Sequence, residues 1–428
     1  MIKGIPPFLV FFISALILSI SPKKIEKVIL IITPILALLN FFVFSSQGFT
    51  FNFLGNTIDF FYQDRVNLPF FYVFIIIAFL GIIYNLHTKE TGEKIFPILY
   101  AGSSVGLIFA GDFISLFFFW ELMAIFSTLI IWQSKTQSSK MAGIRYLLVH
   151  LLGGFLLLTG IVLLYKETGS FSFQNFDSKS FYSLFILTGF LINSAVPPFS
   201  AWLPDSYPES TIGGSVFLSA YTTKSAVYVL IRFFSGSEIL VILGSIMAVY
   251  GVIYAFMVLD MRRLLSYHII SQVGFMVVGV GLGTPLAING AISHAFTHII
   301  YKGLLFMSVG AIIYATGKER LNELGGLFDK FKYVFIFYSI GALSISGAPL
   351  LSGFVSKSLT ITASQEEHNI FVWFMLNLAS TGTFISVALK LPYLAFFGKD
   401  NRNYEYKDIP YNMTLAMLIS SLLCIIIG

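Results

Sequence analysis

Titratable residues recur at intervals of four within one apolar stretch, residues 294–306 (HAFTHIIYKGLLF). His294, His298 and Lys302 stand at i, i+4 and i+8, so on an α-helix they share one face, about 6 Å apart per step along the axis. A neutral histidine accepts a proton on one ring nitrogen and releases it from the other. The spacing therefore favours a proton relay. A metal site on the two histidines is disfavoured because it has no evident carboxylate partner.

Four further ionisable residues stand alone in apolar runs, namely Glu121, Lys224, Lys357 and Lys390. A charge at the centre of a bilayer costs at least about 3 kcal/mol, so ionisable residues there indicate ion or proton pathways. A lysine kept from water can release and regain a proton. We therefore interpret all four residues, together with the group at 294–302, as candidates for proton transfer.

Each of these residues also has a structural interpretation. Glu121 can be a protonated packing residue, and Lys224 can form a fixed salt bridge, for example with Glu121. Lys357 can extend its amine to the outer surface, and Lys390 can stand near the inner end of its helix. His150 is alone in its segment, and we interpret it as a packing residue.

The composition indicates the environment of these residues. Of the 428 residues, 57% are hydrophobic and 11% are charged, and the mean hydropathy is +0.85. Soluble domains average about 25% charged residues. Apolar runs of about 20 residues recur from end to end, as is typical of transmembrane helices, and the alternating pattern of an outer-membrane barrel is absent. The sequence therefore predicts an all-α polytopic membrane protein.

Other compositional features exclude several kinds of site. Cys424 is the single cysteine, so disulfides within the chain, cysteine-rich zinc sites and iron–sulfur clusters on its own cysteines are excluded. No cofactor ligands are evident. The net charge of +5 is small and lies mostly in loops, so nucleic acid is not an expected partner. The apolar run after Lys3 lacks a small-residue cleavage site, and we interpret it as a span.

The apolar runs predict fourteen spans and no soluble domain. The expected spans are 5–21, 28–44, 68–86, 95–111, 113–132, 146–165, 181–199, 214–234, 239–259, 264–282, 286–315, 333–363, 370–397 and 409–428. The polar and aromatic connection 45–67 is expected to form a small surface hairpin. We group the chain into an N-terminal three-helix segment (1–94), two five-helix units (95–234 and 239–397) and a C-terminal helix (409–428).

The cations in the connections predict the orientation. With the N-terminus outside, the inward connections carry seventeen Lys and Arg residues and the outward ones carry four. Cations favour the cytoplasmic side, so both termini are predicted to lie on the outer side of the cell membrane. The remaining cations fall within spans and are Lys224, Arg232, Lys302, Lys357 and Lys390.

Two spans contain helix breakers. Pro197 interrupts the seventh span and Pro349 interrupts the twelfth. Proline removes a backbone donor and clashes with the preceding turn, and interrupted helices in corresponding positions indicate inverted repeats in transporters. The two breaks lie five spans apart. Lys224 falls one span after the first break and Lys390 one span after the second, which supports a duplicated unit.

At these residues the sequence resembles the antiporter-like membrane subunits of respiratory complex I, Mrp-type Na⁺/H⁺ antiporters and membrane-bound hydrogenases. The similar stretches, in chain order, are 119–121 (FWE), 202–205 (WLPD), 214–216 (GSV), Lys224, 260–267 (DMRRLLSY), 294–306 and 353–357 (GFVSK). The details at 205–209 (DSYPE) and 222–224 (TTK) are most similar to the D-type subunit of multisubunit Na⁺/H⁺ antiporters.

The resemblance implies about fourteen helices with two inverted five-helix repeats, each containing a broken helix. It also implies a hydrated axis in which Glu121, Lys224, the group at 294–302 and Lys357 pass protons along, within a complex of other membrane subunits. One position departs from the family. Its usual lysine before the first proline is Asn193 here, with Trp202 as the anchor. Asparagine cannot take up a proton, so either Lys224 pairs with Glu121 instead or this half does not pump.

Three functions remain open from the sequence. The first is a proton-conducting subunit of an Mrp-like antiporter, with Na⁺ as the candidate exchanged cation. The second is the same fold in a redox-driven enzyme of the complex I or hydrogenase type, with all redox cofactors in partner subunits. The third is a non-conducting membrane scaffold, motivated by Asn193.

Overall fold

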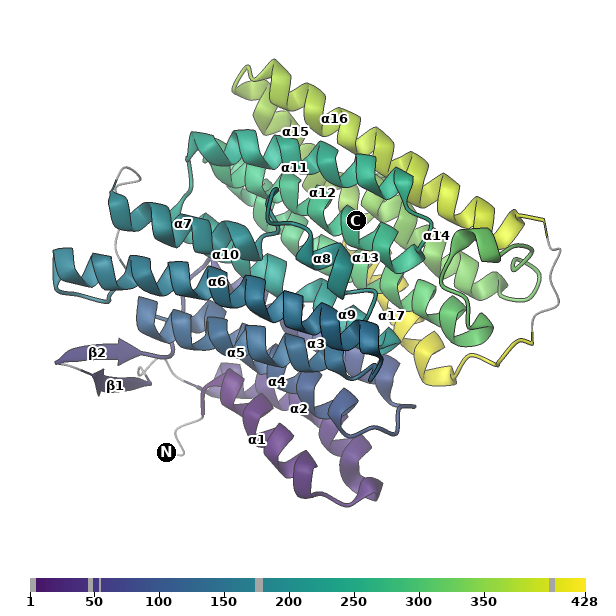
Figure 1. Cartoon of the computed structure of the whole chain (residues 1–428), viewed down its shortest axis with the longest axis horizontal. Coiled ribbons are helices and arrows are strands. Elements are labelled where there is room, and N and C mark those ends of the chain that lie inside the picture. The colour runs from purple at the N-terminus through teal and green to yellow at the C-terminus, as the bar shows by residue number, and fades with distance from the viewer. Residues whose placement is uncertain (1–4, 45–48, 54, 174–179, 400–404) are drawn as a thin grey trace.

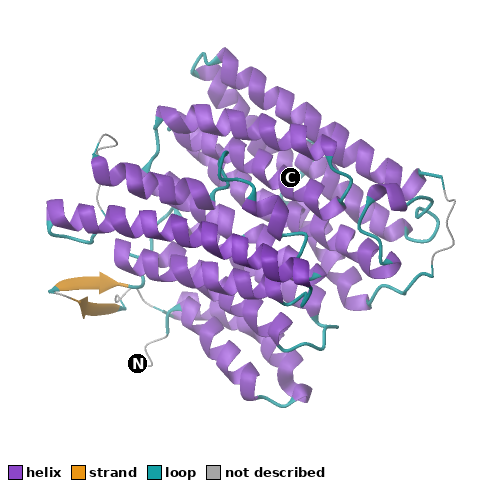
Figure 2. Ribbon diagram, viewed as in Figure 1, coloured by secondary structure: helices purple, strands orange, loops and turns teal. Residues whose placement is uncertain are grey.

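The computed structural model describes residues 5–44, 49–53, 55–173, 180–399 and 405–428. Within those ranges the chain is a bundle of helices with one β-hairpin at its edge (Figure 1, Figure 2). Most of the helices run side by side along one common direction (Figure 1). Lys3, Lys179 and Arg402, which were counted in predicting the orientation, lie outside the described residues.

Helical structure occurs at every predicted span, although several spans are shorter than predicted or interrupted. The helices are α1 (Pro7–Ile20), α2 (Lys23–Val43), α3 (Asn67–Asn85), α4 (Gly92–Phe109), α5 (Phe113–Trp132), α6 (Gln137–Thr168), α7 (Phe181–Asn193), α8 (Trp202–Ser206), α9 (Ile212–Ala220), α10 (Thr222–Phe233), α11 (Glu238–Met257), α12 (Met261–Leu282), α13 (Pro285–Thr316), α14 (Lys332–Ser346), α15 (Ser352–Glu366), α16 (Ile370–Thr383) and α17 (Tyr411–Ile426).

Many of these helices have the length and composition of membrane spans. Within the described ranges, eight helical runs are long and apolar enough to cross a membrane: α2, α3, α5, α6, α11, α12, α13 and the run 370–397 that begins with α16. Helices α1, α7, α14 and α17 are also apolar but shorter. The protein is therefore a mainly helical, multi-pass membrane protein.

Capping residues lie at the helices whose observed limits agree most closely with the predicted ones. Asp112 accepts the backbone N–H groups of Ile114 and Ser115 at the start of α5, at 2.8 and 2.9 Å. Thr284 caps the start of α13, and Gly317 ends it in the left-handed conformation with φ 68°. Aspartate and threonine are favoured N-caps, and glycine is favoured after a helix C-terminus. The fifth and eleventh spans therefore lie within one residue of their predicted limits.

The hairpin predicted within residues 45–67 is confirmed. Strands β1 (Thr50–Phe53) and β2 (Asn56–Asp59) pair antiparallel and project from one end of the bundle (Figure 1). The backbone N–H of Asp59 donates to Asp112 Oδ2 at 2.6 Å, so the hairpin is tied to the start of α5. Burial raises the pKa of the Asp59 carboxyl.

Arg232 forms an ion pair and two aromatic contacts at the same end of the bundle. Its guanidinium donates to Asp64 Oδ2 at 2.6 Å and lies over the rings of Tyr62 and Phe173, 5.2 and 5.0 Å from their centroids. This cation near the end of α10 thus has a carboxylate partner and two aromatic faces, which suit a guanidinium. Arg232 fastens the connection after β2 to α10, in contrast to the deeper lysines described below.

Helices α12 and α13 form the centre of the bundle. In their most apolar stretches, 94% of the residues of α12 and 89% of those of α13 are buried, against 33% for the peripheral α2. Helix α13 packs on α12, α14 and α15 and also on α3, α9 and α17. Most residues of α12 and α13 are therefore shielded from lipid by the surrounding helices.

The first predicted break is present. Helix α7 stops at Asn193, four residues before Pro197, and the chain turns before resuming as α8. The carbonyl of Ile192, at the end of α7, accepts a hydrogen bond from the indole N–H of Trp202 at 3.0 Å. Backbone carbonyls freed by a break in lipid need partners within the protein or water, and Trp202 supplies one here.

The second predicted break is also present. Helix α14 ends at Ser346, and Gly347 adopts a left-handed conformation with φ 79°. The N–H of Ala348 donates to Leu343 at 3.0 Å, which satisfies a terminal carbonyl. Helix α15 then begins so close to α14 that a Cβ on Gly353 would lie 1.8 Å from the carbonyl oxygen of Ser344.

The prediction of a continuous helix over 214–234 is wrong. The helix is interrupted at Tyr221, between α9 and α10, in a stretch without proline. The predicted span 370–397 is also irregular, because α16 continues as two π-helical segments, η2 (Phe384–Lys390) and η3 (Tyr393–Phe397). Such departures from the α-helix often accompany functional sites.

Candidate functional site in the bundle core

The predicted stack on α13 lies wholly inside the protein. His294, His298 and Lys302 are all 0% exposed, and the two imidazole centroids are 6.0 Å apart. Ser356 Oγ on α15 lies 2.9 Å from His294 Nδ1. Among the described residues, His294 Nε2, both nitrogens of His298 and Lys302 Nζ have no hydrogen-bond partner. The stack on α13 thus forms a row of buried, titratable side chains whose polar atoms are largely unpaired.

Lys357 joins the stack from α15. Its side chain is 3% exposed and its ammonium donates to Ser380 Oγ at 3.3 Å, while lying 5.0 Å from the centroid of the Phe275 ring. The side chain thus turns into the bundle and does not reach the surface as its structural interpretation required. Ser356, the residue before Lys357, is the contact of His294, so α15 connects this lysine directly to α13.

Lys224 lies at the unpredicted break. It is 0% exposed, and its ammonium donates to the carbonyl of Ser219 at 2.5 Å, one of the carbonyls at the end of α9. Helices α9 and α10, which flank this break, both pack on α13. Lys224 forms no ion pair with Glu121, since both residues are described and no such contact exists. The proposed salt bridge between them is therefore wrong.

Glu121 is partly buried on α5 and faces α6. A Cβ on Gly154 would lie 1.8 Å from Glu121 Oε1, so the carboxylate rests directly on the glycine backbone. Within the part of the chain that the structure describes, Oε1 is buried and has no hydrogen-bond donor. The carboxylate fits in this position because Gly154 on the facing helix has no side chain.

His150 and Asn193 form a hydrogen-bonded pair next to Glu121. His150 Nδ1 lies 2.9 Å from Asn193 Oδ1, and His150 is one helical turn from Gly154 on α6. The ring of His150 also packs against the tilted ring of Tyr146 and edge-to-face against Trp202, with centroids 4.1 and 4.6 Å away. The interpretation of His150 as a packing residue alone therefore misses a polar contact.

A second polar pair on α12 was not predicted. His268 Nε2 lies 2.8 Å from Ser386 Oγ, and Gln272 donates to Thr383 Oγ1 at 3.4 Å. Thr383 ends α16 and Ser386 lies in η2. The signal in the sequence was a histidine and a glutamine at i and i+4 in an otherwise apolar span.

Lys390 lies apart from the buried row. Its ammonium donates to the carbonyls of Phe256 and Val258, at 2.7 and 2.9 Å, and thereby caps the C-terminus of α11. Cations at a helix C-terminus are stabilised by the helix dipole. This geometry agrees with the interpretation of Lys390 as a residue near a helix end.

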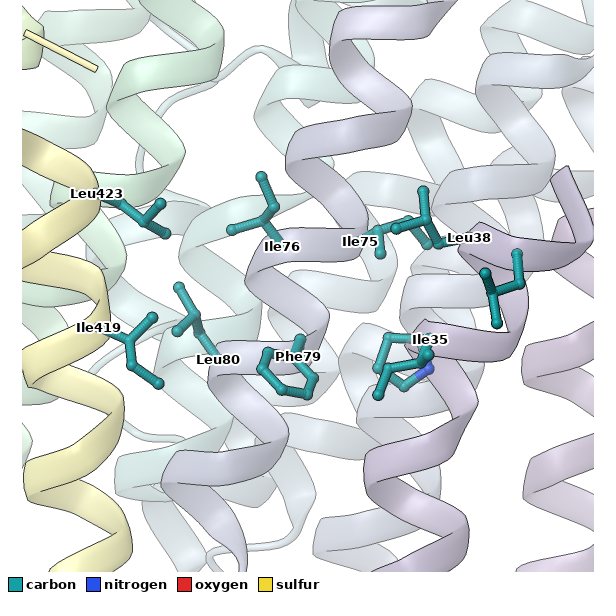
Figure 3. A pocket seen from close by; sticks show the side chains of 10 residues that line it. Ile35, Leu38, Ile75, Ile76, Phe79, Leu80, Ile419 and Leu423 are labelled. Carbon is teal, nitrogen blue, oxygen red and sulfur yellow. The ribbon is translucent and has the colours of Figure 1, made fainter. Parts of the chain in front are cut away.

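Grooves elsewhere in the protein do not suit ions. The groove between α2, α3 and α17, with a volume of about 290 Å³, is lined by apolar side chains such as Ile35, Phe79 and Leu423 (Figure 3). The described residues contain no group of three or more His, Cys, Asp or Glu side chains placed to hold a metal. This groove therefore offers no polar ligand for an ion.

Known proteins share both the sequence and the fold. An uncharacterized protein of Methanocaldococcus jannaschii is 28% identical over 427 residues, covering 94% of this chain and 88% of the relative. The D subunit of the Na⁺/H⁺ antiporter of Alkalihalophilus pseudofirmus is 29% identical over 343 residues, covering 76% of this chain and 69% of the relative. These matches extend over most of both relatives.

Two solved structures superpose on nearly the whole chain. A chain of the membrane-bound sulfane sulfur reductase, an archaeal respiratory membrane complex, has a TM-score of 0.87 and 25% identity, covering 99% of this chain and 75% of its own length. A chain of the Mrp complex from Dietzia sp. DQ12-45-1b has a TM-score of 0.86 and 22% identity, covering 98% of this chain and 93% of its own length. The second likeness shows the fold alone.

The family match covers the buried ionisable residues between Glu121 and Lys357. The family described as NADH:quinone oxidoreductase/Mrp antiporter, transmembrane, matches residues 110–386, more than half of the chain. This stretch contains Glu121, His150, Lys224, the stack on α13 and Lys357. The chain therefore belongs to the NADH:quinone oxidoreductase/Mrp antiporter family of membrane proteins.

Proposed function

We propose that this chain is the proton-translocating membrane subunit, of the D type, in a multisubunit cation/proton antiporter. The observation that carries the proposal is the row His294, His298 and Lys302, which is fully buried, with Lys224 and Lys357 also buried on helices α10 and α15 that pack on α13. A bundle that only packs has no use for several unpaired titratable groups in its centre, because each costs free energy to bury. The named relative from Alkalihalophilus pseudofirmus supports the antiporter assignment.

In this proposal protons move between the two broken helices. Glu121 and Lys224 serve the first half, the stack on α13 forms the middle, and Lys357 serves the second half. Side chains and short water chains exchange the proton at each step, as in other buried relays. Lys390, which caps α11, lies at the inner end of the second half and is the outlying member of the predicted set.

A surface cavity next to Lys357 supports an exit on that side. The cavity has a volume of about 330 Å³ and is lined by residues of the second break and of α16, including Ser346, Gly347 and Ser380. Ser380 is the residue that accepts the hydrogen bond of Lys357. Protons held at Lys357 therefore have a short polar route out of the core.

We further propose fourteen membrane spans and two inverted five-helix repeats, covering 95–234 and 239–397. In this arrangement α7 and α8 correspond to α14 and α15, and the broken pair α9 and α10 corresponds to α16 with its π-helical continuation. Glu121 on α5 then corresponds to the polar pair on α12. Both termini face the outside of the cell membrane, and other membrane subunits complete the assembly.

A redox-driven enzyme is the second candidate. It is favoured by the 25% identity and TM-score of 0.87 with a chain of the sulfane sulfur reductase complex. In that case this chain keeps the same proton path, and electron transfer in partner subunits drives it. The subunits that co-purify with the tagged chain separate the candidates: small membrane subunits indicate the antiporter, and iron–sulfur subunits indicate the redox enzyme.

Proton flux in vesicles tests the function. The tagged chain is purified with its co-purifying subunits and reconstituted into liposomes holding a pH-sensitive dye, and an outward Na⁺ gradient is imposed. We expect cation-dependent proton uptake in the wild type and uptake at background in Lys224→Ala and in Lys357→Ala. Both variants remove a buried titratable group. Normal uptake in both variants contradicts the proposal, and the surface variant Lys318→Ala serves as control.

Gly154→Ala tests the placement of Glu121. The added Cβ occupies the position of Glu121 Oε1, and the flexible carboxylate must move. Misplacing a reacting group by about 1 Å can cost up to about 100-fold in rate, so we expect a loss of about 10-fold or more in proton flux with normal assembly. The control is Phe155→Ala, one residue along α6, where the side chain is 66% exposed. Unchanged flux in Gly154→Ala counts against a role for Glu121.

A further inference from the structure

His150 lies in an enclosed polar site in the first half of the chain. The residue is 1% exposed, and its ring packs against the rings of Tyr146 and Trp202. Asn193, at the end of α7, supplies its hydrogen bond. The break after α7 and the middle of α6 thus meet at this imidazole.

The hydrogen bond to Asn193 decides which nitrogen of His150 carries the proton. An amide oxygen has no hydrogen and can only accept. His150 Nδ1 therefore donates to Asn193 Oδ1 at 2.9 Å, and in the neutral ring Nε2 presents a lone pair. That nitrogen is buried and has no partner among the residues described. The site holds a neutral histidine ready to accept a proton at Nε2.

The Glu121 carboxylate, which contacts α6 one turn away from His150, also has an unpaired oxygen. Glu121 Oε1 rests against Gly154, one turn or about 6 Å along α6 from His150. If His150 only packed, the described structure would leave Glu121 Oε1, His150 Nε2 and Asn193 Nδ2 buried together without partners. Buried polar groups without partners destabilise a folded protein. A proton shared between the carboxylate and the imidazole gives Glu121 Oε1 and His150 Nε2 a partner.

Tyr146 connects the surroundings of His150 to the helix that carries Lys224. The Tyr146 hydroxyl donates to Ser127 Oγ at 2.9 Å and lies 3.4 Å from Thr222 Oγ1. Thr222 begins α10, two residues before Lys224. Tyr146, which packs against His150, therefore also contacts the start of α10, the helix that carries Lys224.

We propose that His150 is the proton carrier of the first half, in the place of a lysine at position 193. This inference rests on the proposed proton translocation. The Glu121 carboxyl gives its proton to His150 Nε2, which leaves a carboxylate and an imidazolium. The imidazolium then releases the same proton from Nε2 to the neutral amine of Lys224, which becomes an ammonium. Asn193 is a positioning residue that holds Nδ1 and fixes the tautomer.

The test uses a side chain that keeps the contact and loses the proton site. His150→Gln retains a donor for Asn193 but cannot take up a proton. In the reconstituted complex we expect it to lower cation-dependent proton flux by at least about 10-fold, with normal assembly by size-exclusion chromatography. His368→Gln, on the exposed turn after α15, is the matched control and should be unchanged.

A second variant separates proton transfer from packing. His150→Gln combined with Asn193→Lys places a titratable amine at the end of α7, and we expect it to recover most of the lost flux. A packing defect is not repaired by a charge at position 193. Loss of subunits from the purified His150→Gln complex, with no recovery in the double variant, assigns His150 to packing and overturns the proposal.

The outcomes distinguish this inference from the function on which it rests. Normal flux in both Lys224→Ala and Lys357→Ala counts against proton translocation through this chain. Normal flux in His150→Gln, while those two lysine variants are inactive, overturns the role of His150 alone. Loss in His150→Gln with recovery in the double variant supports it.

Discussion

Lys302→Met is expected to abolish proton flux and to raise the thermal stability of the assembled protein at the same time. Lys302 is 0% exposed, and within the described structure its ammonium makes no hydrogen bond; the ring of Phe306 lies 5.9 Å away. Methionine has a similar shape and no polar atom to bury. Removing a buried, unpaired polar group stabilises a protein by about 1 to 3 kcal/mol, whereas losing the proton site costs at least about 100-fold in flux.

The two effects are measured on one preparation. Proton uptake in proteoliposomes gives the flux, and the midpoint of thermal unfolding followed by tryptophan fluorescence gives the stability. Lys318→Met, on the exposed connection after α13, is the control and should alter neither. A lower midpoint in Lys302→Met shows that the ammonium is paired and structural, which contradicts its assignment to the proton path.

Gly353→Ala is expected to prevent the two halves of the second broken span from packing. A Cβ at this position would lie 1.8 Å from the carbonyl oxygen of Ser344, and backbone cannot move aside as a side chain can. We expect a loss of about 3 kcal/mol or more in the free energy of unfolding. Because Ser356 and Lys357 follow on the same helix, flux should fall with the yield of folded protein.

Fluorescence-detected size-exclusion chromatography measures the yield of assembled Gly353→Ala. The neighbouring Phe354→Ala removes far more atoms, but from a side chain that is 42% exposed on the bundle surface. Its yield should therefore stay close to wild type. Equal yields from the two variants contradict the close contact between α14 and α15.

The sequence was most informative where one residue decides the local backbone. Asp112 and Thr284 cap the two helices whose limits the apolar runs predicted within one residue, and Pro197 and Pro349 mark the two predicted breaks. The spacing of the stack on α13 fixed its common face, because a helix leaves no other arrangement. The hairpin at 45–67 followed from a polar stretch between apolar runs.

The misses have a common physical cause. The interruption at Tyr221 contains no proline or left-handed residue, and the break is accompanied by packing and by the hydrogen bond from Lys224 to Ser219. The alternative interpretation, in which Lys224 forms a salt bridge with Glu121, is wrong because Glu121 turns toward Gly154 on α6. Contacts between distant helices, such as His268 with Ser386, depend on tertiary packing that periodicity does not encode.

The buried lysines have a collective consequence. Lys224, Lys302 and Lys357 are buried on α10, α13 and α15, and both α10 and α15 pack on α13. Two unit charges 10 Å apart in a medium of effective dielectric constant 20 repel by about 1.7 kcal/mol. In the proton path that we propose, a proton bound at one of these groups therefore disfavours a proton at its neighbours. Protonation at one end of the path would thus promote proton release at the other end.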